Sequence, residues 1–495
     1  MTTRLIPKRI PLKSGAGVVK ATSCRSSHAA AYTRPPLAYT WLTKSPEAIT
    51  HQDVLSSLNQ TSTDSLNQSS FPLLLVTPRL AHWLDPSSPF LSDLLAELYR
   101  NHPGPRTVYA AAAVVDKIPG ATTESPVSDA LEYEGLSLLV VQDAGVQWKA
   151  TPPRRIGQSA GEEPSLTVSI HNEVTGQTPH EIGLRLAQTV FLNGKERTFL
   201  GMRWTADANS TYRLDKSLDL AACAVSSTGK NIRAGLTLPL DVVTPRRRVL
   251  ASMGNIIRQV AKSTDLSSTE AMPASTELEK ELPRYITEHK ITDRRVSIWA
   301  LVEKPKIELV DGSSHDRLIH SLKQGGKLHR VMSGGGGWGK KLGLLSLDPE
   351  ASFPDFMGDD VPATLDKVFE SDATYVEKTV AFENLMIGDD LSHLSQIATV
   401  GDLIQFFVAV EPVPSSEEPV LMKEATFTFG IVADAEKAVV EDLGQDKHLV
   451  TVEDAFGALS EKAITYSQPL QLEGAVKSTT KLDIPGCRVI LTSEK

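Results

Sequence analysis

The chain has 495 residues, of which 41% are hydrophobic and 22% are charged, and its formal net charge is −9. This length predicts two or three domains, and the composition is typical of a soluble globular protein. Three cysteines are too few for a disulfide-rich scaffold or a cysteine-rich metal site, and no apolar run approaches the roughly 18 residues that a membrane span needs. These classes are excluded, and no specific activity is indicated.

The first segment is basic and free of acidic residues. Residues 1–46 contain eight Lys or Arg and no Asp or Glu, and they are rich in Ser, Thr and Ala. This combination is typical of an organelle transit peptide, so we expect residues 1–34 to be a presequence that directs the protein to the mitochondrial matrix. The alternative is a basic tail that binds an anionic surface. Removing residues 1–34, which hold seven basic residues and no acid, takes the formal charge from −9 to −16. Such an acidic body disfavours non-specific binding to nucleic acid.

Residues 53–70 contain little bulky apolar material, and we interpret residues 35–70 as a polar linker. The first module is expected at 71–145. Its predicted elements are a strand at 71–77, a helix at 88–100 and strands at 107–116 and 135–142. This order of elements indicates a mixed α/β module.

A middle module is expected at 165–262. The pattern predicts a strand at 165–171, a helix at 180–192, strands at 198–205 and 218–225, and a final helix at 244–262. Thr244 is suited to cap that final helix and Pro245 to begin it. Apolar residues at helical spacing follow: Val249, Leu250, Met253, Ile256, Ile257 and Val260.

A third module is expected at 276–495. It begins with a capping-box pattern at 276–279 and contains predicted strands at 295–302, 403–410, 425–432 and 487–491. Residues 341–400 hold twelve acids against three lysines, which is typical of a solvated face; docking to a basic surface is the alternative. The whole chain is therefore predicted to be mixed α/β (α+β), with two to three modules of mixed sheets and flanking helices.

A glycine-rich string is the most unusual motif. Residues 334–340 match G-x-x-x-x-G-K, the start of a phosphate-binding loop, although Lys341 replaces the hydroxyl residue that such a loop needs for Mg²⁺. Its place between two predicted strands is similar to the glycine-rich hairpin of ATP-grasp enzymes, which implies contact with nucleotide phosphates. A plain glycine turn and a partner-binding loop are the alternatives. The candidate cofactor-binding residues, with ATP or another nucleotide as the ligand, are Gly334, Gly335, Gly336, Gly337, Gly339 and Lys340.

The second candidate is a basic group on the predicted helix at 244–262. Arginines in the first turn of a helix face the positive end of its dipole, so an anion or an acidic partner would stabilise them. Pairing with the protein's own carboxylates is the alternative. The candidate partner-binding or anion-binding residues, with RNA as one candidate partner, are Arg246, Arg247, Arg248 and Arg258.

The sequence contains none of the motifs for catalysis or metal binding that we considered. The chain has no H-E-x-x-H and no G-x-S-x-G, and no carboxylate pair stands out among its sixty acids. Cys223 and Cys487 have no His nearby in the sequence, so we expect buried, inert thiols. We assign no catalytic and no metal-ligating residue.

Two resemblances add to these patterns. The basic first segment, the stretches 244–248 and 252–259, and the 334–340 loop together resemble an uncharacterised family of fungal mitochondrial proteins, which implies a location but no activity. The 71–145 module, with 134–141 and the later 400–406, is similar to the FIST sensory module, which implies binding of a small ligand; the cysteine-containing signature of that module is absent. The hypothesis is a matrix protein that binds protein partners in gene expression or complex assembly. A nucleotide-binding enzyme and a FIST-like sensor are the alternatives.

Overall fold

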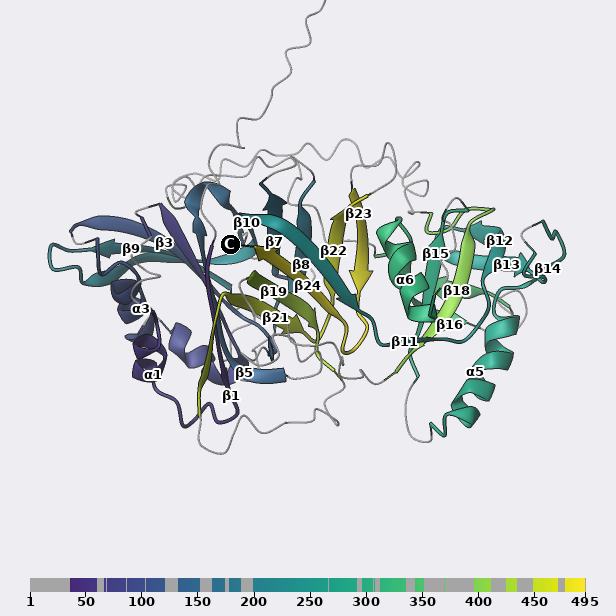
Figure 1. The fold of residues 1–495 in the computed structure, drawn as a ribbon, viewed down its shortest axis with the longest axis horizontal. Coiled ribbons are helices and arrows are strands. Elements are labelled where there is room, and N and C mark those ends of the chain that lie inside the picture. Colours follow the sequence, from purple (N-terminus) through teal and green to yellow (C-terminus); the bar gives the residue numbers. More distant parts are fainter. Residues whose placement is uncertain are drawn as a thin grey trace, which may run out of the picture.

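The structure is a computed structural model, and among the residues that it describes 53% lie in strands and 15% in helices. The expected mixed α/β fold with flanking helices is therefore wrong, because two segments with apolar residues at helical spacing pair as strands. The strands form a large unit on a 16-stranded sheet and a smaller barrel unit (Figure 1). The described residues are 36–59, 66–67, 69–85, 87–102, 104–120, 132–151, 163–173, 178–187, 199–265, 267–291, 296–305, 307, 312–334, 343–350, 369, 396–410, 424–433, 448–470 and 477–494.

The first half of the large unit is a mixed sheet in the order β20-β1-β5-β2-β3-β9-β10. Strand β2 is buried along its whole length, as expected for a continuous apolar run that is covered on both faces. One face packs against α1 (His51–Ser56), the 3₁₀ helix η2 (Pro78–Leu84) and α3 (Phe90–Leu98) (Figure 1). The strands are β20 (Val450–Glu453), β1 (Leu37–Thr43), β5 (Glu132–Gln142), β2 (Ser70–Val76), β3 (Arg106–Val114), β9 (Phe199–Ala206) and β10 (Tyr212–Thr237), with β4 (Ile118–Pro119) paired to β5.

Strand β10 is 26 residues long and joins this sheet to the second half of the unit. Its first part pairs with β9, its middle with β6 (Val146–Ala150) and β7, and its end with β24. The second half packs on the other face of the first sheet, so the unit has a helix layer, a sheet and further strands. Its remaining strands are β7 (Ser165–Asn172), β8 (His180–Arg185), β22 (Ile464–Pro469), β23 (Lys477–Leu482), β24 (Arg488–Glu494), β19 (Glu424–Ile431) and β21 (Ala455–Ser460), with the 3₁₀ turn η3 (Asp143–Gly145) before β6.

The barrel unit is inserted between β10 and β19 and comes from residues 240–409. Six of its strands close into a ring in the order β18-β12-β13-β17-β16-β15, because β15 pairs back to β18. Helices α5 (Thr276–Glu288) and α6 (Ser314–Lys323) lie outside the ring (Figure 1). The strands are β12 (Arg247–Met253), β13 (Ile256–Ala261), β15 (Ile298–Glu303), β16 (Lys327–Gly334), β17 (Leu345–Leu347) and β18 (Leu403–Ala409), with β11 (Leu240–Val242) on β18 and β14 (Ala271–Pro273) on β13.

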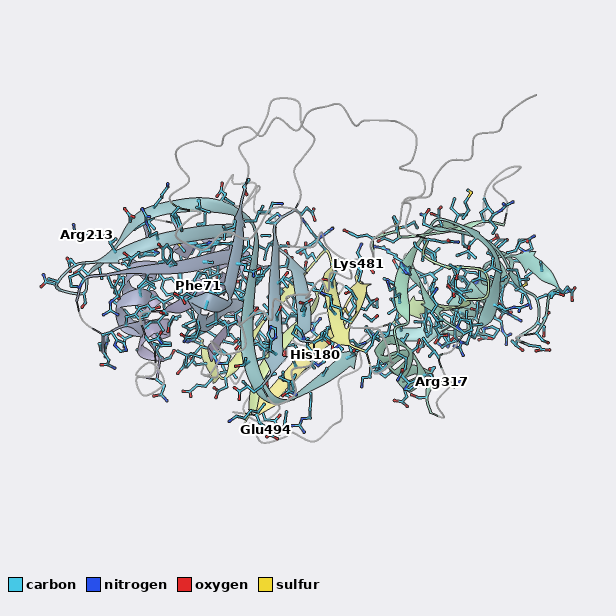
Figure 2. All side chains as sticks on the ribbon, turned by 90° about the horizontal axis from the view of Figure 1, so that it is seen from above. Phe71, His180, Arg213, Arg317, Lys481 and Glu494 are labelled. Atoms are coloured by element: carbon cyan, nitrogen blue, oxygen red, sulfur yellow. The ribbon has the colours of Figure 1, made fainter. Side chains whose placement is uncertain are left out.

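Ion pairs and hydrogen bonds join the two units. Lys481 lies at the junction (Figure 2), and its Nζ is 2.7 Å from Asp348 Oδ2 and 2.6 Å from Glu350 Oε2, both in the barrel unit. Arg185 of β8 also pairs with Glu350. The Trp299 indole donates a hydrogen bond of 2.7 Å to Asp483 of the large unit.

Three predictions of local structure are wrong. The stretch at 35–70 was predicted to be a linker. Instead, residues 37–43 form β1, which lies inside the large sheet, and residues 51–56 form α1. Residues 180–185 form strand β8, in which Ile182 and Leu184 are buried two residues apart, the spacing that places both on one face of a strand. The predicted helix at 244–262 is the β12–β13 hairpin, in which Met253 pairs with Ile256 across a two-residue loop.

The hairpin has a clear local cause. Gly254, in that loop, has φ of +59°, a conformation that glycine adopts without steric cost. Thr244 does not cap a helix; its buried hydroxyl accepts a hydrogen bond of 3.1 Å from the Phe406 amide. No helix among the described residues is long and apolar enough to cross a membrane.

Candidate functional site

A row of aromatic and basic side chains crosses three neighbouring strands of the large unit. Tyr109 of β3 pairs with Arg203 of β9, and Arg203 pairs with Lys216 of β10. Because cross-strand partners point to the same face, these side chains lie side by side, away from α3. Trp148 of β6 lies against them, with its ring centroid 6.4 Å from that of Tyr109. We refer to Tyr109, Trp148, Arg203 and Lys216 as the aromatic site.

Phe369 occupies the aromatic site. Its ring stacks on Tyr109 at a centroid distance of 5.7 Å and meets Trp148 edge-on at 5.5 Å. The Arg203 guanidinium lies over the same ring, 5.5 Å from its centroid, and Lys216 Nζ donates a hydrogen bond of 3.0 Å to the Phe369 carbonyl. Only 2% of Phe369 is exposed. The site therefore binds an aromatic side chain and its backbone together.

The charges of the site match the segment that supplies Phe369. That residue comes from the acidic stretch 341–400, with Asp366, Glu370 and Asp372 close to it in sequence. Arg203 and Lys216 are cations, although Arg203 also pairs with Asp215 at 2.5 Å, which contributes to raising the pKa of Arg203. An aromatic residue in an acidic sequence is thus held by two aromatic rings and two basic side chains.

Trp148 has one unsatisfied group at this site. Its side chain is 2% exposed, and its indole N–H has no hydrogen-bond partner among the residues that the structure describes. A buried donor without an acceptor costs roughly 1–3 kcal/mol. An acceptor on a ligand would remove that cost.

The glycine-rich loop lies mostly outside the described residues. Gly334 ends β16, and a Cβ at this position would lie 2.3 Å from Leu345 Cδ2, so the glycine permits close packing against β17. The other candidate residues fall in the undescribed stretch 335–342: Gly335, Gly336, Gly337, Gly339 and Lys340. Nucleotide binding by this loop stays a prediction.

The four candidate arginines lie on or beside the β12–β13 hairpin, not on a helix. Arg246 pairs with buried Glu303 at 2.6 Å, and Arg247 binds both carboxylate oxygens of Glu277.

Arg248 donates a hydrogen bond of 2.5 Å to the Ser268 carbonyl, whereas Arg258 is exposed on β13. Thus Arg246 and Arg247 pair with the protein's own carboxylates and Arg248 with a backbone carbonyl, so the structure does not bring the four together as one open basic surface.

Metal-ligating and nucleophilic groups are sparse in the described part of the chain. No group of three or more His, Cys, Asp or Glu there has the geometry to hold a metal ion. Cys223 and Cys487 are both buried. Burial raises the pKa of Cys487 to about 12 and raises that of Cys223 further, so both thiols are protonated at neutral pH.

The aromatic site was missed by sequence analysis. Its members are spread from residue 109 to residue 216, its occupant is residue 369, and none of them belongs to a motif. The one signal was the acidic stretch around Phe369, for which docking to a basic surface was the alternative interpretation. No protein-family model matches the chain, and no curated protein or solved structure matches it either.

Proposed function

We propose that this protein acts by binding partner proteins, and that the aromatic site receives an aromatic side chain from an acidic segment of the partner. The observation that carries this proposal is Phe369, which fills the site in cis with its ring and its carbonyl. A site that holds a single buried side chain from a distant segment is suited to hold the same kind of side chain from another protein. The unsatisfied Trp148 indole N–H would donate a hydrogen bond to a carbonyl or carboxylate oxygen of such a ligand.

The contacts at the aromatic site are strong enough for recognition. Burying a Phe side chain contributes about 1.5–3 kcal/mol, and each well-placed aromatic pair adds about 0.5–1.5 kcal/mol. Burial and the two aromatic pairs together give about 2.5–6 kcal/mol, so losing the ring should weaken binding of a segment by at least roughly fifty-fold. Charge attraction between Arg203 and Lys216 and an acidic segment adds a contribution to the binding free energy that decreases as the salt concentration is raised.

A peptide in trans tests the proposal. The probe is a fluorescent peptide with the sequence of residues 362–373, in which Phe369 is the one aromatic residue. We expect it to bind the full chain carrying Phe369→Ala, and to bind the unaltered chain at least roughly ten-fold more weakly, because there the tethered Phe369 competes at high effective concentration. The readout is fluorescence anisotropy.

Two controls make this result specific. A peptide with alanine in place of Phe369 should not bind, and Arg203→Gln in the Phe369→Ala chain should weaken binding, whereas Arg213→Gln, at an exposed position of the same sheet, should not. If both peptides bind equally, or neither binds, the contact of Phe369 is only internal packing and the proposal fails.

The proposed place of action is the mitochondrial matrix, and it rests on residues 1–46, which have eight basic residues and no acid. These residues fused to a fluorescent reporter should localise to mitochondria and be shortened on import. A second fusion, with Arg4, Lys8, Arg9 and Lys13 changed to Gln, should lose import, because the inward pull of the membrane potential depends on their charge. Cytosolic or secretory fluorescence of the first fusion would contradict the location.

A further inference from the structure

Polar side chains without hydrogen-bond partners gather at one end of the large unit. The atoms are His102 Nε2, Arg106 Nε and Nη1, Trp204 Nε1 and the Tyr212 hydroxyl. Each is shielded from solvent and has no hydrogen-bond partner in the described part of the chain. Tyr212 is 4% exposed and Trp204 is 3% exposed. Because native proteins leave few buried donors unpaired, five such atoms in one region need a cause.

The strand register brings these side chains to one face. Arg106 of β3 and Tyr212 of β10 both pair with Ala206 of β9, so the three side chains form one row on the same face of the sheet. Trp204 lies two residues earlier on β9 and therefore on the same face. This face packs against α3, opposite to the aromatic site.

The end of α3 completes the group. Tyr99 is the C-cap residue of that helix, and its ring centroid is 6.2 Å from that of Tyr212. The Arg106 guanidinium carbon lies 5.7 Å from the Tyr99 ring centroid. The Tyr99 hydroxyl is already used, because it donates a hydrogen bond of 2.6 Å to the Ser70 carbonyl. His102 follows, tied by its amide to the Tyr99 carbonyl at 2.9 Å. We refer to His102, Arg106, Trp204 and Tyr212 as the donor cluster.

The unpaired nitrogens of Arg106 and Trp204 are donors, the Tyr212 hydroxyl can donate or accept, and His102 Nε2 donates in one tautomer. The complement is a group made of acceptors. A carboxylate offers two oxygens and about four lone-pair sites, whereas a phosphoryl group offers three oxygens and carries up to two negative charges. Two guanidinium nitrogens of Arg106, Nε and Nη1, have no partner, so this side chain can donate to an anion while it supplies a positive charge.

We infer that the donor cluster binds the phosphoryl group of a small molecule, with Arg106 as the charged anchor and Tyr212 and Trp204 as buried neutral donors. Asp143 lies near enough to Tyr99 to act on it electrostatically, so binding of an anion has to overcome repulsion from this carboxylate. Arg213, the residue next to Tyr212, lies at the end of the molecule that is farthest from the barrel unit (Figure 2). This inference is independent of partner binding at the aromatic site.

Inorganic phosphate is the probe that tests the inference on the full chain. We expect phosphate to bind with measurable heat in isothermal titration calorimetry and to raise the melting temperature above that in sodium chloride of equal ionic strength. Arg106→Met, which keeps the length of the side chain but removes its N–H groups, should weaken phosphate binding roughly ten- to hundred-fold. Tyr212→Phe, which removes one oxygen, should weaken it several-fold.

Phosphate also stabilises proteins in general by exclusion from their surfaces, so a matched variant is needed. Arg213→Met removes the same charge from the neighbouring, exposed position, and it should respond to phosphate as the unaltered chain does. The inference is overturned if calorimetry detects no binding, or if Arg106→Met and Arg213→Met respond alike. If Arg106→Met fails to fold, Tyr212→Phe gives the same comparison, and an undiminished response there overturns the inference as well.

Discussion

Arg488 and Glu132 form the most deeply buried ion pair among the described residues, with side-chain exposures of 1% and 4%. Arg488 Nη2 lies 2.8 Å from Glu132 Oε1, and Nη1 donates hydrogen bonds to the carbonyls of Cys487, at 2.9 Å, and Ile431. Glu132 also accepts a hydrogen bond of 2.7 Å from the Ala433 amide. The pair thus ties β5 to β24, 356 positions later in the chain.

Replacing Arg488 by Met should destabilise the large unit strongly. The change leaves a buried carboxylate without its cation and leaves two carbonyls without these donors, and removing one partner of a buried pair typically costs about 3–5 kcal/mol. That is a large part of the roughly 5–15 kcal/mol by which domains are stable. The double variant Arg488→Met with Glu132→Gln should recover much of the loss, because it no longer buries a net charge.

Urea unfolding followed by tryptophan fluorescence measures this effect. The matched control is Arg233→Met, which removes an arginine paired with Glu424 near the same strands; Arg233 is 65% exposed, so the pair should contribute less than about 1 kcal/mol. Equal losses in Arg488→Met and Arg233→Met would refute the reasoning. They would mean that the last strand does not close the large unit as its register with β10 and β19 requires.

Three further changes test other parts of the fold. Lys481→Met at the junction leaves Asp348 and Glu350 without a shared cation and should cost about 1–3 kcal/mol in urea unfolding, whereas Lys477→Met, from a more exposed pair, should cost under about 1 kcal/mol. Gly254→Val forces a β-branched residue to φ of +59° and should lower the melting temperature, whereas Gly254→Asn should lower it less. Burial raises the pKa of Asp116 to about 6, so folding takes up a proton between about pH 4 and pH 6 and stability falls as the pH rises through that range. Asp116→Asn should therefore stabilise the protein at pH 8, by up to about 2–3 kcal/mol, and have little effect at pH 4; a pH-independent effect would contradict this.

Much of the strand content could be predicted from local patterns. Apolar runs placed β2, β3, β5 and β18 correctly, because a strand covered on both faces is apolar throughout. The helical stripe at 90–98 also predicted α3 correctly. These patterns are local, so they predict an element correctly even when its packing partners are unknown.

The errors arose where a pattern fitted two structures. In the 244–262 segment, apolar residues recur at a spacing that suits a helix, but the Gly254–Asn255 pair between two apolar runs is also a hairpin signal, and the closed ring of the barrel unit decides for the hairpin. The insertion of the barrel unit between β10 and β19 leaves no local mark, because strands from both ends of the chain complete the large sheet. Phe369 was missed for the same reason: its partners on β3, β6, β9 and β10 are distant in sequence.

The aromatic site and the donor cluster share β3, β9 and β10, and one irregularity makes that arrangement work. On β9, Arg203 and Ala206 are three residues apart and so face opposite sides of the sheet. On β10, their partners Lys216 and Tyr212 are four residues apart, which in a regular strand would place both on the same side. The register shift between Leu214 and Lys216 adds one residue to β10 and restores the alternation. The bulge therefore allows one strand to present Tyr212 beneath α3 and Lys216 beside Phe369, so the geometry of both sites depends on its position.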